Sequence, residues 1–321
     1  MDNLRIHITP EDFIADLDEI ADGSEPRSRC KYYIRPYGIH GINEACEANY
    51  YVGNRVPYHE HKEGFETFLV DGGAIEILSL SKKAVARKGD IVHIMPGTPH
   101  SIHALEDNSI WRAFHQGLWL VDQMADERAL RDRHWDAVFD PSFKKESSAL
   151  NGSTWFEYQY PDCRDVPASE IPCIRTFDAA LAEYSFEGIS LKLKVGRWET
   201  AGAKEVWQLH LDASYKLSWD ELHRFQHLYD VFSGSVRVTL EGMEPFVANA
   251  RDILHIPRFM AGSIETLEET VLMDLGCQGY LTRFVDELTL IKKTEPAKLK
   301  DTALIREVMK RNGYNVLFGN L

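Results

Sequence analysis

Four residues between positions 53 and 100 have the types and the spacing of a metal site. They are two histidines separated by one residue, a glutamate five residues after the second histidine, and a third histidine at position 100: His59, His61, Glu66 and His100. Side chains at positions i and i+2 of a β-strand point to the same face, so His59 and His61 can present two imidazoles to one point. Three imidazoles and a carboxylate suit one divalent transition metal ion, with iron expected first and manganese, nickel, copper, cobalt or zinc as alternatives.

The segment that carries these residues has the pattern of an antiparallel β domain over residues 31–120. Short runs rich in isoleucine and valine, such as 74–78 and 90–94, are separated by glycine turns. The turn before His100, at residues 95–99, contains two prolines and a glycine. Prolines restrict the backbone, so this turn can fix the direction of His100.

A second β block over residues 174–283 is similar to the first. Residues 71–78 compare with 232–239 at an offset of 161, and residues 89–94 compare with 251–256 at an offset of 162. Two matches in nearly the same register indicate duplication of one β unit.

Three further segments are predicted to be helical or irregular: an N-terminal helical extension over 1–30, a helical and irregular connector over 121–173, and a C-terminal helical tail over 284–321. In the extension, Thr9 can cap a helix over 9–22. In the tail, an amphipathic helix over 297–311 is expected to end at Gly313.

The quartet and its flanking glycines resemble the two sequence motifs of the cupin superfamily. The first, G-x5-H-x-H-x4-E-x6-G, is met in full by Gly53, His59, His61, Glu66 and Gly73. The second, G-x5-P-x-G-x2-H-x3-N, is met by Gly89, Gly97 and His100. Met95 replaces its proline and Ala104 its asparagine, neither of which is a metal ligand in the family.

The resemblance implies a mainly β fold of two tandem cupin barrels (double-stranded β-helices, or jelly rolls) with short flanking and connecting helices. The first barrel would hold the metal. In the second barrel, the same offsets bring the four ligand positions onto Asp220, Leu222, His227 and Gly262, so its site is degenerate. Glu221, His223 and His227 could form a different site there, but polar residues at a strand end or interface are the interpretation we favour, because no histidine follows the second turn.

Several other residues lie close to the quartet in the sequence. His103 lies three residues after His100, so strand alternation turns it to the opposite face. Phe68 lies two residues after Glu66, and Ile102 two residues after His100, so each is expected on the same strand face as that ligand. Both are therefore candidates for a pocket wall or simply for the core. Glu66 is the candidate catalytic residue, as a ligand that can also accept a proton from a bound substrate.

A shell of four protein ligands leaves about two positions of an octahedron open. Two open positions favour an oxygen-dependent dioxygenase for a small aromatic or enol-type substrate, similar to the bicupin dioxygenases of the quercetinase kind. One alternative is a non-oxidative cupin enzyme, such as a decarboxylase, isomerase or lyase for a small acid or sugar. A second alternative is a non-catalytic metal- or ligand-binding bicupin.

Composition narrows the partners and the compartment. The net charge of −14 disfavours nucleic acid and anionic membranes, which would be repelled. The five cysteines are odd in number and form no C-x-x-C pair, which favours a reducing, cytoplasmic environment without disulfides. No signal peptide and no apolar run of about 20 residues is evident. A small-molecule substrate is expected, and pairing into a homodimer is expected by analogy with other bicupins.

Overall fold

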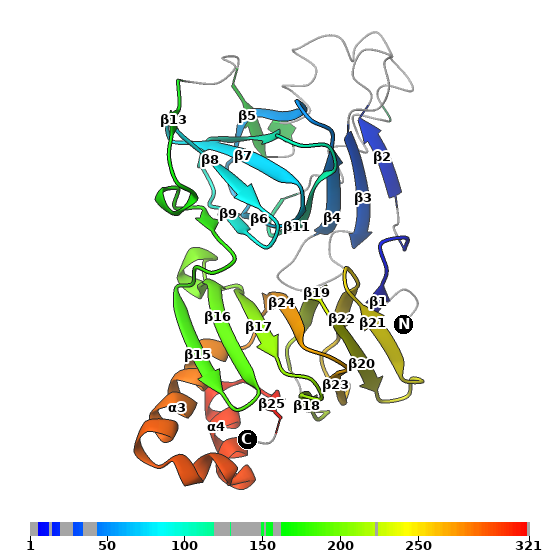
Figure 1. Ribbon diagram of the computed structural model, residues 1–321, viewed down its shortest axis with the longest axis vertical. Helices are drawn as coiled ribbons and strands as arrows, with labels where there is room; N and C mark the ends of the chain where they lie inside the picture. The colour runs from blue at the N-terminus through cyan, green and yellow to red at the C-terminus, as the bar shows by residue number, and fades with distance from the viewer. Residues whose placement is uncertain are drawn as a thin grey trace. The chain divides into compact units, whose positions relative to one another are not determined.

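The computed structural model describes residues 6–12, 15–19, 28–34, 44–118, 129, 149–150, 152–156, 162–221 and 224–319. The chain divides into two compact units. The N-terminal unit is Phe13–Asp178, and the C-terminal unit combines Ala179–Leu321 with the first segment of the chain, Met1–Asp12. Figure 1 shows that β-strands dominate both units.

The N-terminal unit contains two sheets, antiparallel apart from the short parallel pair β8–β13. The seven-stranded sheet has the order β14 (Ile174–Arg175), β9 (Ile91–Ile94), β6 (Glu66–Gly72), β11 (Ser109–His115), β4 (Glu44–Tyr50), β3 (Ser28–Ile34) and β2 (Ala15–Glu19). The six-stranded sheet has the order β12 (Ser153–Trp155), β5 (Arg55–His61), β10 (His100–Ala104), β7 (Ala74–Ser79), β8 (Lys82–Arg87) and β13 (Arg164–Asp165). A short 3-10 helix, η2, spans Ala168–Glu170.

The apolar faces of these two sheets share one core. Phe68 and Val70 of β6 belong to the same cluster as Ile75 and Ile77 of β7 and Ile102 of β10. All five side chains are at most 1% exposed. Alternate residues of each strand point inward, so the two sheets enclose a jelly-roll interior, as the sequence predicted.

The C-terminal unit repeats this plan. Its seven-stranded sheet has the order β1 (His7–Ile8), β22 (Ile253–Ile256), β19 (His227–Ser233), β24 (Thr270–Cys277), β17 (Glu205–Leu211), β16 (Ile189–Val195) and β15 (Ala182–Phe186). Its five-stranded sheet has the order β21 (Phe246–Asn249), β20 (Ser235–Leu240), β23 (Gly262–Thr266), β18 (Lys216–Trp219) and β25 (Leu317–Phe318). A 3-10 helix, η3, spans Arg197–Glu199.

Strand pairing confirms the internal duplication. Strand β6 pairs with β9 so that Thr67 lies opposite His93, and β19 pairs with β22 so that Leu228 lies opposite His255. The two histidines thus occupy equivalent, buried places, as their spacing suggested. His93 contacts the hydroxyl of Thr67 through Nδ1 at 2.8 Å, which is a structural role for this imidazole.

The predicted helix over 9–22 is wrong where the structure describes it. Residues Ala15–Glu19 form strand β2, which pairs with β3. Thr9 and Asp12 do bond to each other, through the Thr9 hydroxyl and the Asp12 carboxylate at 2.7 Å, but they close a turn that does not continue as a helix. Cross-strand hydrogen bonds from β3 override the local helical pattern, because propensity is weaker than tertiary pairing.

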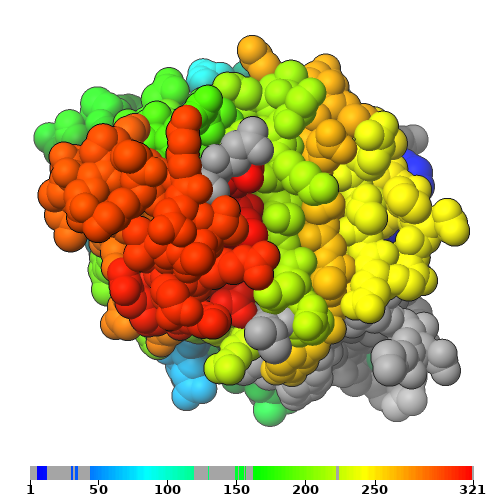
Figure 2. Space-filling model, turned by 90° about the horizontal axis from the view of Figure 1, so that it is seen from below, coloured from blue at the N-terminus to red at the C-terminus, as the bar shows by residue number. Residues whose placement is uncertain are grey.

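Two helices follow the last strand of the C-terminal unit. Helix α3 (Leu281–Thr294) begins before the predicted tail. The range 297–311, predicted as one helix, is divided between the 3-10 helix η4 (Pro296–Lys300) and helix α4 (Thr302–Asn312). The Asp301 carboxylate caps α4, and Gly313 ends it with a φ of 65°, as expected. Figure 2 shows these helices, in orange and red, gathered on one side of the unit and the yellow β20–β21 hairpin on the other.

Phe284, Val285 and Leu288 attach α3 to the core of the C-terminal unit. Among the described residues, no helix is both long enough and apolar enough to cross a membrane. The predicted connector helix within 121–140 lies outside the described residues, apart from Ala129.

Candidate metal centre

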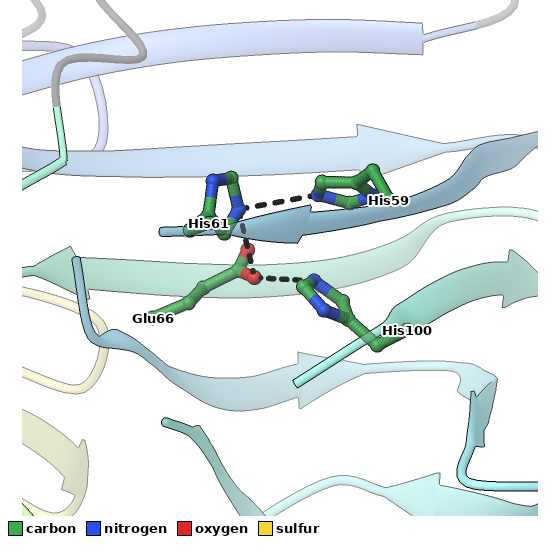
Figure 3. A group of neighbouring side chains, drawn as sticks. All are labelled: His59, His61, Glu66 and His100. Carbon is green, nitrogen blue, oxygen red and sulfur yellow. Dashed lines mark hydrogen bonds and ion pairs between the residues drawn. The ribbon is translucent and has the colours of Figure 1, made fainter. Parts of the chain in front are cut away.

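Three strands from two sheets bring the quartet together. His59 and His61 lie on β5, His100 begins β10, and Glu66 begins β6 of the other sheet. Antiparallel pairing places His59 directly opposite His100. The four side chains point toward one another in Figure 3, so the structure unites the residues that the sequence singled out.

The distances within the group suit a single ion. One ligand atom from each residue lies within 4.8 Å of the others. The Nε2 atoms of His59 and His61 are 3.2 Å apart, and one oxygen of Glu66 is 2.8 Å from Nε2 of His100 and 3.6 Å from Nε2 of His61. All four residues are buried, with exposed fractions of 0–5%.

The opposite nitrogen of each imidazole is fixed by an oxygen atom. Nδ1 of His59 contacts the carbonyl of Pro57 at 2.7 Å, and Nδ1 of His100 contacts the carbonyl of Thr98 at 2.9 Å. Nδ1 of His61 contacts the hydroxyl of Ser153 at 2.9 Å. Partners of this kind set the tautomer of a metal-binding histidine and leave Nε2 as the donor to the ion.

The number of N–H groups on the His100 imidazole also indicates a cation. A neutral imidazole has one N–H, yet both nitrogens of His100 face oxygens that accept hydrogen bonds, the Thr98 carbonyl and the Glu66 carboxylate. A neutral ring can satisfy only one of them. A positive charge on the ring, or a metal ion between Nε2 and Glu66, resolves the conflict, and the two further Nε2 atoms beside it favour the ion.

The protonation states suit metal binding as well. Burial lowers the pKa of His59 well below its ordinary 6.5, and the neighbouring imidazoles of His100 and His61 lower it further. Burial would raise the pKa of Glu66, but hydrogen bonds from His100 and His61 outweigh it and hold this pKa well below 4.5. His59 is therefore neutral and Glu66 ionised at neutral pH, which are the forms that bind metals. The site fits one divalent metal ion.

Ser153 is a member of the site that sequence reasoning missed. It lies on β12 within the stretch 121–173, which the sequence predicted to be a connector, and this strand pairs with β5 so that Ser153 faces His61. Its side chain is buried. No spacing rule could have found it, since 92 positions separate it from its histidine.

The neighbouring candidates occupy distinct places. Phe68 and Ile102 belong to the packed core of the N-terminal unit. His103 pairs instead with Glu76 through Nδ1 at 3.3 Å. The role of Phe68 and Ile102 as a pocket wall remains a proposal.

Known structures resemble this fold over most of its length. The formate complex of Lactobacillus farciminis oxalate decarboxylase matches 84% of this chain and 85% of its own, with a TM-score of 0.52 at 14% identity. A variant of Bacillus subtilis oxalate decarboxylase matches 84% and 76%, with a TM-score of 0.50 at 16% identity. Both are two-barrel cupins. The chain has a two-barrel cupin fold. Comparisons with protein-family models and with curated protein sequences find no match.

Within the described residues, the second barrel lacks the quartet. Where His59 lies opposite His100 in the first barrel, β18 and β23 place Trp219 opposite Gly262. The register therefore assigns the position of His59 to Trp219 rather than to Asp220, which is exposed. A Cβ atom on Gly262 would come within 3.0 Å of the Trp219 indole, so this bulky ring fills space that two imidazoles share in the first barrel.

The alternative set proposed for the second barrel is not assembled in the described residues. Glu221 is exposed, whereas His227 is buried and contacts Asp274. Leu222 and His223 lie outside the described residues.

Proposed function

We propose that this bicupin is a metal-dependent enzyme and that one ion held by His59, His61, Glu66 and His100 is its reactive centre. The convergence of three Nε2 atoms and a carboxylate carries the proposal. Four protein donors leave two octahedral positions for a substrate. A structural ion is usually enclosed by its protein ligands, so an incomplete shell supports a catalytic role.

The substrate we propose is a small carboxylic acid, and the reaction a non-oxidative one such as decarboxylation. The ligands are at most 5% exposed, and apolar side chains fill the interior of the same barrel, which suits a small anion better than a large aromatic molecule. The similar structures support this choice, because they are oxalate decarboxylases and one of them binds formate. The first barrel alone would carry the reaction, because the second lacks the same ligands.

The side chains of the site would have separate roles in the reaction. When bound, the metal supplies a Lewis acid for the substrate carboxylate. Glu66 is ionised and can accept a proton from a bound substrate. In a decarboxylation, a carbon–carbon bond breaks, carbon dioxide leaves and a proton takes its place, so the site needs a group that can carry that proton. Glu66 is our candidate for it, while Ser153 keeps His61 in orientation.

A dioxygenase for a small aromatic or enol-type substrate is the second candidate. The observation that favours it is the same pair of open positions, because a substrate and dioxygen could bind there side by side. The sequence alone favours this dioxygenase, but the buried ligands and the apolar side chains in the same barrel place it second.

Gas exchange separates the two candidates. Metal content would be measured first, and the purified protein then mixed with small 2-oxo and dicarboxylic acids, including oxalate, and with a catechol, a flavonol and a 1,3-diketone. We expect carbon dioxide release from a small acid without net oxygen uptake, and its loss in His61→Ala. Oxygen consumed in proportion to an aromatic or diketone substrate would instead establish the dioxygenase. A fully metallated protein inactive on the whole panel would contradict both candidates.

A further inference from the structure

The C-terminal unit contains a second group of side chains that could hold a metal ion, with different donor atoms. His227 begins β19, while Asp274 and Cys277 lie at the end of the neighbouring strand β24. One ligand atom from each lies within 4.8 Å of the others. We propose that His227, Asp274 and Cys277 bind a second transition-metal ion.

Strand pairing holds the three donors in position, and two of them contact each other. Nδ1 of His227 is 2.6 Å from a carboxylate oxygen of Asp274. The imidazole stacks on Tyr229 with an interplanar angle of 1° and meets the edge of Tyr314, so the ring has little freedom. Fixed donors lose little entropy when they bind an ion, which favours binding.

The burial of these three side chains favours a bound cation. His227 and Asp274 are each 1% exposed, and Cys277 is fully buried. An ionised carboxylate so far from water is costly unless a cation compensates it. Lys204, also buried, is one charged group that acts on Asp274, and the proposed ion would be a second.

Glu205 lies close to the group but has other partners. One of its oxygens accepts a hydrogen bond from the indole of Trp207 at 2.8 Å, and the other accepts one from the hydroxyl of Thr282 at 2.8 Å. This carboxylate therefore links β17 to the start of α3 and leaves the proposed ligand set at three. A fourth, tetrahedral position would remain for a small ligand.

The position of the group differs from that of the first centre. His227 is the counterpart of Glu66, whereas Asp274 corresponds to Ala113, which has no ligand atom in its side chain. Cys277 pairs with Glu205 as His115 pairs with Glu44, and neither Glu44 nor His115 belongs to the first centre. The ligands of the first centre come from both sheets, while these three come from adjacent strands of one sheet. The second group is thus a separate arrangement and not a remnant of the duplicated one.

The donor set selects a class of ion. A thiolate, an imidazole and a carboxylate favour zinc, cobalt or iron over magnesium and calcium, which prefer oxygen ligands. Cys277 ends β24 just before α3, and Tyr314 follows α4. An ion bound to these strands would therefore stabilise the end of the unit to which its C-terminal segment attaches.

Cobalt provides the test, because a thiolate ligand gives a charge-transfer band that a site of nitrogen and oxygen donors lacks. We expect the metal-free full-length chain to bind two Co²⁺ ions and to develop this band. In His61→Ala, which disables the first centre, one ion and the band should remain. In Cys277→Ser, one ion should remain and the band should disappear, while the control Cys163→Ser should match the wild type.

The wild-type chain alone can overturn the proposal, whether or not the variants fold. Absence of a thiolate band, whether one or two Co²⁺ ions bind, would mean that the cluster is a buried network of hydrogen bonds. A band that persists in Cys277→Ser would point to another cysteine and would equally refute the assignment. None of these results depends on the activity of the first centre.

Discussion

The two barrels have the same strand plan but differ at one pairing of strands, β5 with β10 in the first barrel and β18 with β23 in the second. The first barrel places an imidazole opposite an imidazole there, while the second places an indole opposite a glycine. Backbone pairing is thus retained while the chemistry between the strands has changed. Because a β-ladder depends on backbone hydrogen bonds, it tolerates either pair of side chains, and only one pair can bind a metal.

The largest expected effect is the loss of the first centre in His61→Ala. This variant removes the donor that contacts both His59 and Glu66, so metal content at this centre should fall to a small fraction of the wild-type value. Elemental analysis measures the content, and circular dichroism checks that the fold is retained. Unchanged occupancy at the first centre would refute the assigned ligand set.

Ser153→Ala should weaken the same centre without removing a ligand. Loss of the hydroxyl that contacts Nδ1 of His61 frees the ring to rotate, and outer-shell partners of this kind are worth about 10- to 100-fold in metal affinity. Competition with a chelator measures the affinity. Thr154→Ala, one residue along β12, is the matched control, and equal affinities in the two variants would show that the hydroxyl contributes nothing.

Gly262→Ala tests the packing that replaces the quartet in the second barrel. The new methyl group would lie 2.5 Å from Leu240 and 2.7 Å from the carbonyl of Thr239, and such overpacking typically costs about 1–3 kcal/mol. The control is Gly72→Ala in the first barrel, where the nearest atom would be 3.4 Å away. Urea unfolding measures both. If the two substitutions cost the same, the second barrel is not closely packed at this point.

Acid should destabilise the metal-free protein through the first centre. The folded-state pKa of His59 is lowered, so below the ordinary value of 6.5 the unfolded chain binds a proton that the folded chain does not. Stability should therefore fall as the pH drops below about 6.5, by at most about 1.4 kcal/mol per pH unit for this single group.

Glu66 extends the same trend to lower pH. Its folded-state pKa is also lowered, so its contribution is complete above the ordinary 4.5 and is lost as the pH falls from there toward the folded-state value. Denaturant unfolding at a series of pH values measures the slope. His59→Gln should reduce it between pH 6.5 and 4.5. A slope unchanged by this substitution would mean that other groups dominate.

Much of the first centre was predictable because its spacing is local. His59 and His61 share a face through strand alternation alone, and the glycine-bounded motifs positioned Glu66 and His100. The predicted helix over 9–22 was wrong because pairing with another strand decides its structure. The segment has a helical pattern, but the backbone of Ala15–Glu19 bonds to β3.

Periodicity and motif spacing therefore account for the duplicated β plan and for the four ligands of the first barrel, because each follows from backbone geometry over a few residues. Ser153 beside His61, Trp219 against Gly262, and Asp274 with Cys277 around His227 follow from strand register between distant segments. Register depends on which face of each strand is buried, and that is decided only when the sheets pack against each other.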